Sequence, residues 1–190
     1  MTSSTVTESL VVVLDGPSGS GKSSVSRAVA QRLGLAYLDT GAMYRALTWW
    51  CLHEGVDLDD EAGVTEAART LPLEMGTDPE DPRVGVAGED VTAAIRETRI
   101  SSVVSAVARH IPAREVLIAR QRACIAERAN PGIIAEGRDL TTVVAPDADV
   151  RLLLSASESA RLARRTRELH GDTDEAHLEA TRDQIVRRDR

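Results

Sequence analysis

The sequence has no phenylalanine, and aromatic residues make up only 2% of its 190 positions. Proteins that bind single-stranded nucleic acids stack the bases on aromatic rings, so this composition argues against such a surface. The net charge of −7 also argues against a chain that binds nucleic acid or membrane as a whole, although arginine clusters can still form local anion sites. We therefore expect neither nucleic acid nor membrane among its partners, and with no strong exposed apolar signal we expect a monomer.

Long apolar runs and cysteine patterns are also missing. No segment approaches the roughly 18 uninterrupted apolar residues of a membrane-spanning helix, and the N-terminal MTSSTVTES lacks the basic and apolar stretches of a signal peptide. Cys51 and Cys124 belong to no CxxC or Cys/His pattern, which favours buried reduced thiols. The four histidines show no metal-ligand spacing, so no zinc site is expected. These features predict a cytoplasmic protein.

Apolar runs of strand length alternate with segments of helical periodicity. The expected strands are Leu10–Leu14, Leu35–Leu38, Gly132–Ala135 and Val150–Leu154, and the expected helices are Lys22–Leu33, Ala42–His53, Ala113–Arg128, Glu158–Leu169 and Glu175–Arg188. This alternation is typical of a parallel sheet covered by helices on both faces. The predicted fold class is therefore α/β, in a single domain.

Two places depart from this rhythm. Between Leu71 and Ile95, the turn-rich stretch TDPEDPR separates two short extended pieces, LPLEM and RVGVAG, which predicts a small β insertion. Near Pro112, the missing backbone donor of proline predicts that one helix ends and another begins.

Lysine occurs once, because 22 of the 23 basic residues are arginine. That residue, Lys22, lies in GPSGSGKSS, between the apolar run LVVVLD and a helical segment. The stretch from Gly16 to Ser23 fits the phosphate-loop pattern in the strand-loop-helix context that the pattern needs. In such a loop, backbone N–H groups surround phosphate oxygens, the lysine reaches the outer phosphates, and Ser23 ligates Mg²⁺. The alternative is a tight glycine turn with an incidental lysine.

Two further strands end in polar residues. LDTGAMYR places Thr40, Tyr44 and Arg45 after one strand, and ligands of parallel sheets bind at the carboxyl ends of strands. Its alternative interpretation is a helix cap at Asp39 or Thr40 with a solvated Arg45. IIAEGRDLTTVV places Arg138 and its neighbours after another strand, where an arginine can hold a phosphate bidentately.

In the same segment, Asp139 can bind a sugar or base or lie near the metal, and a structural salt bridge with Arg138 is the plainer alternative.

Arginines also gather on one predicted helix: Arg161, Arg164 and Arg165 share a face at i, i+3 and i+4. A charged run is often only a solvated face, but phosphoryl transfer needs cations that close over the moving group.

With these motifs assembled, the chain closely resembles the bacterial cytidylate kinases, which are nucleoside monophosphate kinases of the P-loop type. The matching segments, in the family's order, are DGPSGSGKSSVSR, YLDTGAMYRALT, AGEDVTAAIR, EGRD with TVV after it, and PDADVRLLLSASESARLARR. The resemblance implies a P-loop NTPase-type sheet with a small β-containing monophosphate-binding insertion and a helical lid. The implied parts are a core of about 8–40, 97–157 and 183–190, an insertion of about 41–96, and an arginine-rich lid of about 158–182.

The resemblance also assigns residues and partners. ATP would be bound by Gly16, Pro17, Ser18, Gly19, Ser20, Gly21, Lys22, Ser23 and Ser24, with Mg²⁺ on Ser23. The acceptor, CMP or dCMP, would contact Thr40, Arg45, Ser105, Arg114, Arg138 and Asp139. The transferred phosphate would face Lys22, Arg161, Arg165 and Arg188. The implied reaction is ATP plus CMP or dCMP giving ADP plus CDP or dCDP.

Three departures from the family pattern stand out. The family usually has glycine where this chain has Thr141, and phenylalanine where it has Ala145. The sequence stops at RRDR, where the family continues with an Asp and an Arg that bind the nucleotide and then a last strand and helix, so we expect a C-terminal strand and helix to be missing. The competing functions are a P-loop kinase of another metabolite or other nucleoside monophosphate, a regulatory nucleotide-binding switch, and a non-catalytic nucleotide-binding module.

Overall fold

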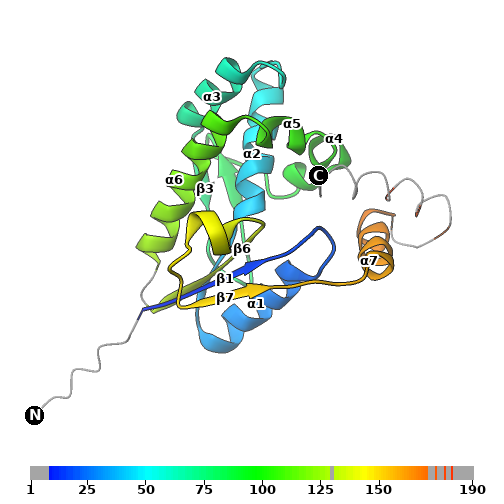
Figure 1. Cartoon of the computed structure of the whole chain (residues 1–190). Helices are drawn as coiled ribbons and strands as arrows, with labels where there is room; N and C mark the ends of the chain where they lie inside the picture. The colour runs from blue at the N-terminus through cyan, green and yellow to red at the C-terminus, as the bar shows by residue number, and fades with distance from the viewer. Residues whose placement is uncertain (1–8, 129–130, 171–173, 175–177, 179–180, 182–190) are drawn as a thin grey trace, which may run out of the picture.

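The structure is a computed structural model that describes residues 9–128 and 131–170 and the single positions 174, 178 and 181. Its central sheet has four parallel strands in the order β2-β6-β1-β7 (Figure 1). The bounds are β1 Leu10–Asp15, β2 Ala36–Asp39, β6 Gly132–Gly137 and β7 Val150–Leu153. The four predicted strands are confirmed, with ends shifted by one or two residues.

The register of the sheet brings three strand ends to one edge. Asp15 at the end of β1 lies opposite Gly137 of β6, and Asp39 at the end of β2 lies opposite Glu136. The loops that follow these strands therefore start side by side, although they are distant in the sequence.

Alternate residues of the strands pack on opposite faces of the sheet. Val12, Tyr37 and Ile134 belong to one buried cluster, which includes Ala30 of helix α1, Lys22–Leu33. Their neighbours in the strands belong to a larger cluster with helices α2, Thr40–His53, and α6, Ile111–Glu127. Figure 1 shows α1 on one side of the sheet and α2 and α6 on the other, as the α/β prediction requires.

The main helices begin where local chemistry allows. The backbone of Gly21, at φ 98°, lies in the left-handed region that favours glycine and leads directly into α1. Asp39 caps α2, because its side chain accepts a hydrogen bond from the Ala42 N–H. Pro112 lies in the first turn of α6, where its missing donor costs nothing, so the predicted helix break is confirmed.

A group of short helices packs against α2 and α6. Its members are α3 Glu61–Thr70, the 3₁₀ turn η1 Ala94–Arg96, α4 Thr98–Ser101 and α5 Val104–Ala108. Helix α3 was not predicted, because its buried face consists of Val64, Ala67 and Ala68 with Thr65, which give a weak apolar signal.

The predicted β insertion is an antiparallel sheet of β3 Leu73–Met75, β4 Val84–Val86 and β5 Glu89–Asp90. The third strand was not predicted. It follows a hairpin turn at Ala87 and Gly88, whose φ angles of 53° and 80° suit the right-handed twist of the strands.

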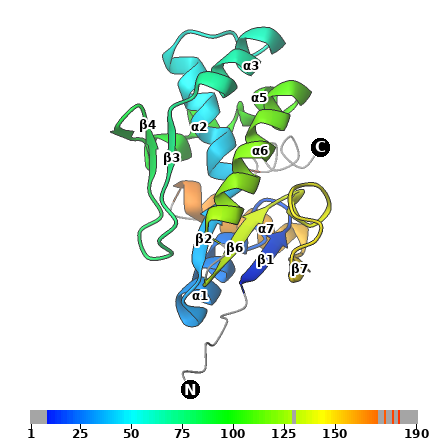
Figure 2. The ribbon, with the colours of Figure 1, turned by 90° about the vertical axis from the view of Figure 1, so that its left-hand side faces the viewer.

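The connection between β3 and β4 returns to the central sheet. In Figure 2 it runs down beside β2. The Tyr37 N–H donates to the Thr77 carbonyl at 2.8 Å, and the Arg27 guanidinium of α1 donates to the carbonyls of Pro79 and Glu80 at 2.7 and 3.1 Å. Arg27 thus joins the helix after the phosphate loop to the insertion.

Two elements complete the described chain. A single π-helical turn, η2 Leu140–Val144, follows β6, and helix α7, Glu158–His170, follows β7. Most of the predicted helix Glu175–Arg188 falls outside the described residues. Among the helices that the structure describes, none combines the length and apolar character needed to cross a membrane.

We predict that Arg27→Ala lowers the free energy of unfolding by about 1 to 2 kcal/mol, because two carbonyls lose a charged donor. The measurement is urea denaturation at pH 7, together with amide hydrogen exchange in the β3–β4 connection. Arg32→Ala, on the exposed end of the same helix, is the matched control. Equal stability of the two variants, with unchanged exchange, contradicts the prediction.

Candidate active site

The phosphate-loop segment connects β1 to α1 and needs its glycines for space. A Cβ on Gly16 would lie 2.2 Å from the carbonyl oxygen of Leu154, and one on Gly19, at φ +74°, would lie 2.7 Å from that of Arg161. The loop is therefore packed against the start of α7 and the residue after β7. The Lys22 Nζ donates across the loop to the Pro17 carbonyl at 3.0 Å.

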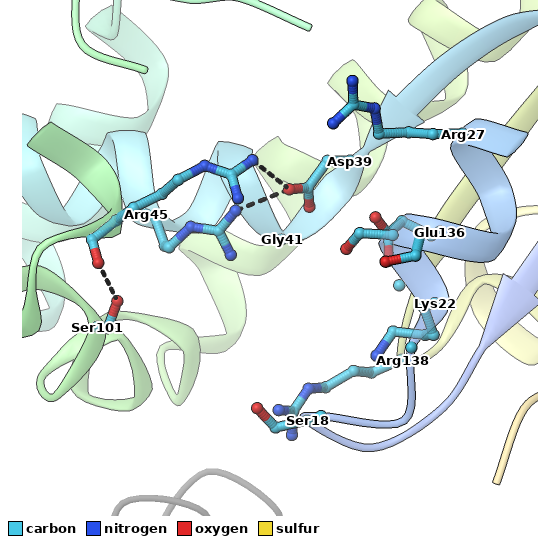
Figure 3. A pocket seen from close by; sticks show the side chains of 15 residues that line it. Ser18, Lys22, Arg27, Asp39, Gly41, Arg45, Ser101, Glu136 and Arg138 are labelled. Atoms are coloured by element: carbon cyan, nitrogen blue, oxygen red, sulfur yellow. Dashed lines mark hydrogen bonds and ion pairs between the residues drawn. The ribbon is translucent and has the colours of Figure 1, made fainter. Parts of the chain in front are cut away.

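An open cavity of about 510 Å³ lies between this loop and the segments that follow β2 and β6. Figure 3 shows side chains from both sides pointing toward it. The lining residues of the loop and α1 are Ser18, Gly19, Gly21, Lys22, Ser23, Ser24 and Arg27. The remaining ones are Asp39, Gly41, Arg45, Arg96, Ser101, Glu136, Gly137 and Arg138.

Asp39 organises the cations on the side of the cavity away from the loop. Its carboxylate pairs with Arg45 at 2.8 Å and with Arg96 at 3.9 Å, as the dashed lines in Figure 3 mark. Burial acts to raise the pKa of Asp39, but the two guanidinium groups and the Ala42 N–H outweigh it and hold the pKa below its usual value. The cap interpretation of Asp39 is therefore correct, whereas Arg45 is a largely buried partner and not a solvated charge.

Glu136 is the buried acid beside the phosphate loop. Its side chain accepts a hydrogen bond from the Tyr37 hydroxyl, and its backbone carbonyl accepts one from the Thr40 hydroxyl at 2.7 Å. Only 3% of Glu136 is exposed, so burial raises its pKa, and the nearby Asp39 charge raises it further. Ser23 also hydrogen-bonds to this carboxylate.

Ser23 and Glu136 offer one hydroxyl oxygen and one carboxylate beside the phosphate loop. Oxygen donors of this kind suit Mg²⁺, which usually takes one or two protein ligands and completes its shell with phosphate oxygens and water. No group of three His, Cys, Asp or Glu side chains able to hold a metal occurs in the described part of the chain. The donor set thus fits a magnesium ion that takes its other ligands from phosphate oxygens and water.

Asp139 and Arg114 form a second ion pair, next to the cavity. Their side chains meet at 2.8 Å, and Tyr44 of α2 hydrogen-bonds to the same arginine. Because Asp139 follows directly after the cavity-lining Arg138, this pair connects α6 to the cavity wall.

Helix α7 contributes arginines to the outside of the phosphate loop. Arg161 donates to the Ser18 carbonyl at 3.3 Å, and Arg164 donates to the Ser20 carbonyl at 3.0 Å. The prediction that these two share a functional face is consistent with this arrangement. The side chain of Arg165 and the whole of Arg188 lie outside the described residues.

The structure places some of the predicted residues on the wall of the cavity and others outside it. Ser105 is exposed on α5 and does not line the cavity, whereas Ser101, which was not predicted, is buried and does. The prediction also assigned no site role to Arg27, Asp39, Arg96 and Glu136. Glu136 and Asp39 directly follow predicted strands and could have been found from that position. Arg96 and Ser101 give no local signal, because they reach the cavity only through the packing of η1 and α4.

Comparison with known proteins identifies close relatives. The family described as "Cytidylate kinase" matches residues 12–190. A "Cytidylate kinase" of Streptomyces griseus is 48% identical over 97% of this chain and 78% of its own length, and one of Cutibacterium acnes is 50% identical over 97% and 81%. A "Bifunctional pantoate ligase/cytidylate kinase" of Synechococcus is 44% identical over 97% of this chain and 38% of its own length.

We predict that Glu136→Gln changes how stability depends on pH. Relative to wild type, the variant should be more favoured at neutral pH than at acid pH. The folded-state pKa of Glu136 is raised, so the wild-type residue loses stability as the pH rises through that value, whereas glutamine does not titrate. The measurement is urea denaturation of both proteins from pH 4 to pH 8. The difference in unfolding free energy should move in favour of the variant as the pH rises. A difference that is constant, or that moves the other way, contradicts the prediction.

Proposed function

The chain belongs to the cytidylate kinase family, and from this membership we propose that it transfers the terminal phosphoryl group of ATP to CMP or dCMP, giving ADP and CDP or dCDP. The observation that carries the proposal is a cavity that has the phosphate loop on one side and the Asp39-held arginines on the other. A kinase needs both, because two anionic substrates must be held face to face.

The donor site is the loop from Gly16 to Ser24. Its N–H groups and the positive end of α1 suit the phosphates of ATP. Lys22 supplies a compact mobile charge for the outer phosphates. Arg161, with Arg164 beside it, supports the outer wall of this loop through the Ser18 and Ser20 carbonyls.

The acceptor site lies across the cavity. Arg45, Arg96 and Arg138 can neutralise a monophosphate, and the pair of Arg114 and Asp139 presents donors and an acceptor to the nucleoside. Thr40 completes this set by fixing the Glu136 carbonyl. Ser105 remains a predicted contact, and Ser101 is the serine whose position in the cavity supports such a role better.

We assign Mg²⁺ to Ser23 and Glu136, bound together with ATP. The metal, when bound, would neutralise charge on the phosphate oxygens. Tyr37 holds the Glu136 carboxylate in place through its hydroxyl, and Thr40 holds the backbone of the same residue. The protein thus fixes this acid from β2 and from the first residue of α2 before any substrate arrives.

We assign functions to the parts of the chain that are expected from the family. We propose a core of about 8–40, 97–157 and 183–190, an acceptor-binding insertion of about 41–96, and a lid of about 158–182 in which Arg161 and Arg165 face the transferred phosphoryl group. Arg188 is proposed for the same task. The proposed state is a monomer, and the proposed location is the cytoplasm.

The reaction needs no strong general base. An oxygen of the acceptor phosphate is already ionised at neutral pH and can attack the γ-phosphorus in line. Catalysis therefore consists mainly of positioning the two substrates and neutralising the charge that spreads over the transferred group. The arginines and Lys22 perform both tasks.

We predict that ADP release from ATP·Mg²⁺ occurs with CMP and dCMP, and that Lys22→Ala lowers its kcat by about 10²- to 10³-fold with a much smaller change in KM for CMP. The measurement is steady-state kinetics with CMP, dCMP, UMP, AMP, GMP and shikimate offered separately. Any rate with UMP measures how strictly the base is recognised. Unchanged turnover in the Lys22 variant contradicts the catalytic role, and a preference for another acceptor contradicts the proposed substrate.

We also predict that ADP release without an acceptor is slow, because closure of the lid over the phosphates keeps water from attacking. The measurement is the ATPase rate of the wild-type protein with no nucleoside monophosphate present, compared with its rate at saturating CMP. Equal rates in the two conditions indicate a nucleotide-hydrolysing switch and not a kinase.

A further inference from the structure

Asp15 joins the two sides of the active site in the interior of the molecule. It is the last residue of β1, directly before Gly16 of the phosphate loop, and only 3% of it is exposed. Its carboxylate accepts three hydrogen bonds from the segment after Asp139. These come from the Leu140 N–H at 3.0 Å, the Thr141 N–H at 2.8 Å and the Thr141 hydroxyl at 2.7 Å.

These bonds lie just beyond the point where the sheet ends. The parallel pairing of β1 with β6 stops at Asp15 and Gly137. After this point, β1 leads into the phosphate loop and β6 leads to Arg138. The Asp15 side chain therefore extends the connection between the two strands past their last backbone pairing. It joins the proposed donor loop to the proposed acceptor loop at the position where the two loops separate.

The bonds also complete the π-helical turn Leu140–Val144, which Figure 1 shows in yellow above the strands of the central sheet. The first N–H groups of any helical turn lack partners within the turn, and Asp15 supplies them for Leu140 and Thr141. The other end is held by Arg122, whose guanidinium donates to the carbonyls of Val143 and Val144. Anchored at both ends, the turn is a rigid support for Arg138 and Asp139.

Thr141 adds a bond that a glycine cannot make. The backbone of Thr141 is outside the left-handed region, so a side chain fits without strain. Its hydroxyl donates to the same carboxylate oxygen as its own N–H. The shortest of the three bonds to Asp15 thus comes from the threonine side chain.

We propose that Asp15 and Thr141 are positioning residues for the acceptor: through the Leu140–Val144 turn they fix Arg138 and Asp139 relative to the phosphate loop. This inference rests on the proposed function, because it assigns the acceptor to that side of the cavity. Neither residue lines the cavity. The effect of removing their bonds should therefore appear in the use of the acceptor and not in the binding of ATP.

The first test is Thr141→Val, which keeps the shape of the side chain and removes the hydroxyl. We expect KM for CMP to rise about 3- to 10-fold, the range that the loss of one hydrogen bond gives, with KM for ATP within twofold of wild type. Thr141→Ser should restore the wild-type value, because serine keeps the donor. Thr142→Val, at the exposed neighbouring position, is the matched control and should behave as wild type.

The second test is Asp15→Asn, which places an amide donor against either the Leu140 N–H or the two donors of Thr141. We expect kcat/KM for CMP to fall by about 10- to 100-fold, with the circular dichroism spectrum unchanged. In the double variant Asp15→Asn/Thr141→Val, the losses should combine to less than their product, because both changes remove the same contact. Losses that simply multiply contradict a shared contact.

Amide hydrogen exchange of residues 138–144 separates a failure of this inference from a failure of the proposed function. Exchange in this segment should be faster in Thr141→Val than in wild type or Thr142→Val, whatever the acceptor. If wild type does not use CMP but exchange responds in this way, the proposed function fails and the structural coupling stands. If wild type uses CMP, and both KM and exchange are the same in all Thr141 variants, the inference is wrong.

Discussion

The pairing register of β6 with its two neighbours is the constraint on which the active site depends. It places Asp15 beside Gly137 and Asp39 beside Glu136, so three loops leave the sheet at one edge. A slip of one residue in either pairing would turn every side chain of a strand to the opposite face. Glu136 would then leave Tyr37, and the two buried clusters would both be disrupted. The hydrophobic alternation that builds the core therefore also fixes the positions of the residues that follow these strands and line the cavity.

Acidic residues hold the cations of the site in a molecule whose net charge is −7. Asp39 pairs with Arg45 and Arg96, and Asp139 pairs with Arg114, so these guanidinium groups are placed before an anionic substrate arrives. Charges organised in advance cost little reorganisation during the reaction. Glu136 differs from these two acids, because burial raises its pKa and disfavours its ionised form. A carboxylate kept at such a cost to stability is typical of a functional position.

The sequence predicted the features that depend on neighbouring residues. Apolar runs located the four strands, Pro112 located the start of α6, and the spacing of Gly16, Gly21 and Lys22 located the phosphate loop. It did not predict α3, whose buried residues are small, or the π-helical turn, which depends on Asp15 from a distant strand. It also did not predict that Arg96 and Ser101 line the cavity, because only tertiary packing brings their segments there.

The near absence of lysine has a structural counterpart in the way the arginines are used. Arg27, Arg120 and Arg122 each donate through two nitrogens to two backbone carbonyls, and each of them joins segments that are distant in the sequence. The planar fork of a guanidinium can bridge two such oxygens, whereas an ammonium is a compact point charge on a flexible stem. Lys22 occupies the position where such a point charge is needed, with its Nζ inside the curve of the phosphate loop at 3.0 Å from the Pro17 carbonyl. These three arginines therefore join parts of the fold, whereas the single lysine lies in the phosphate loop.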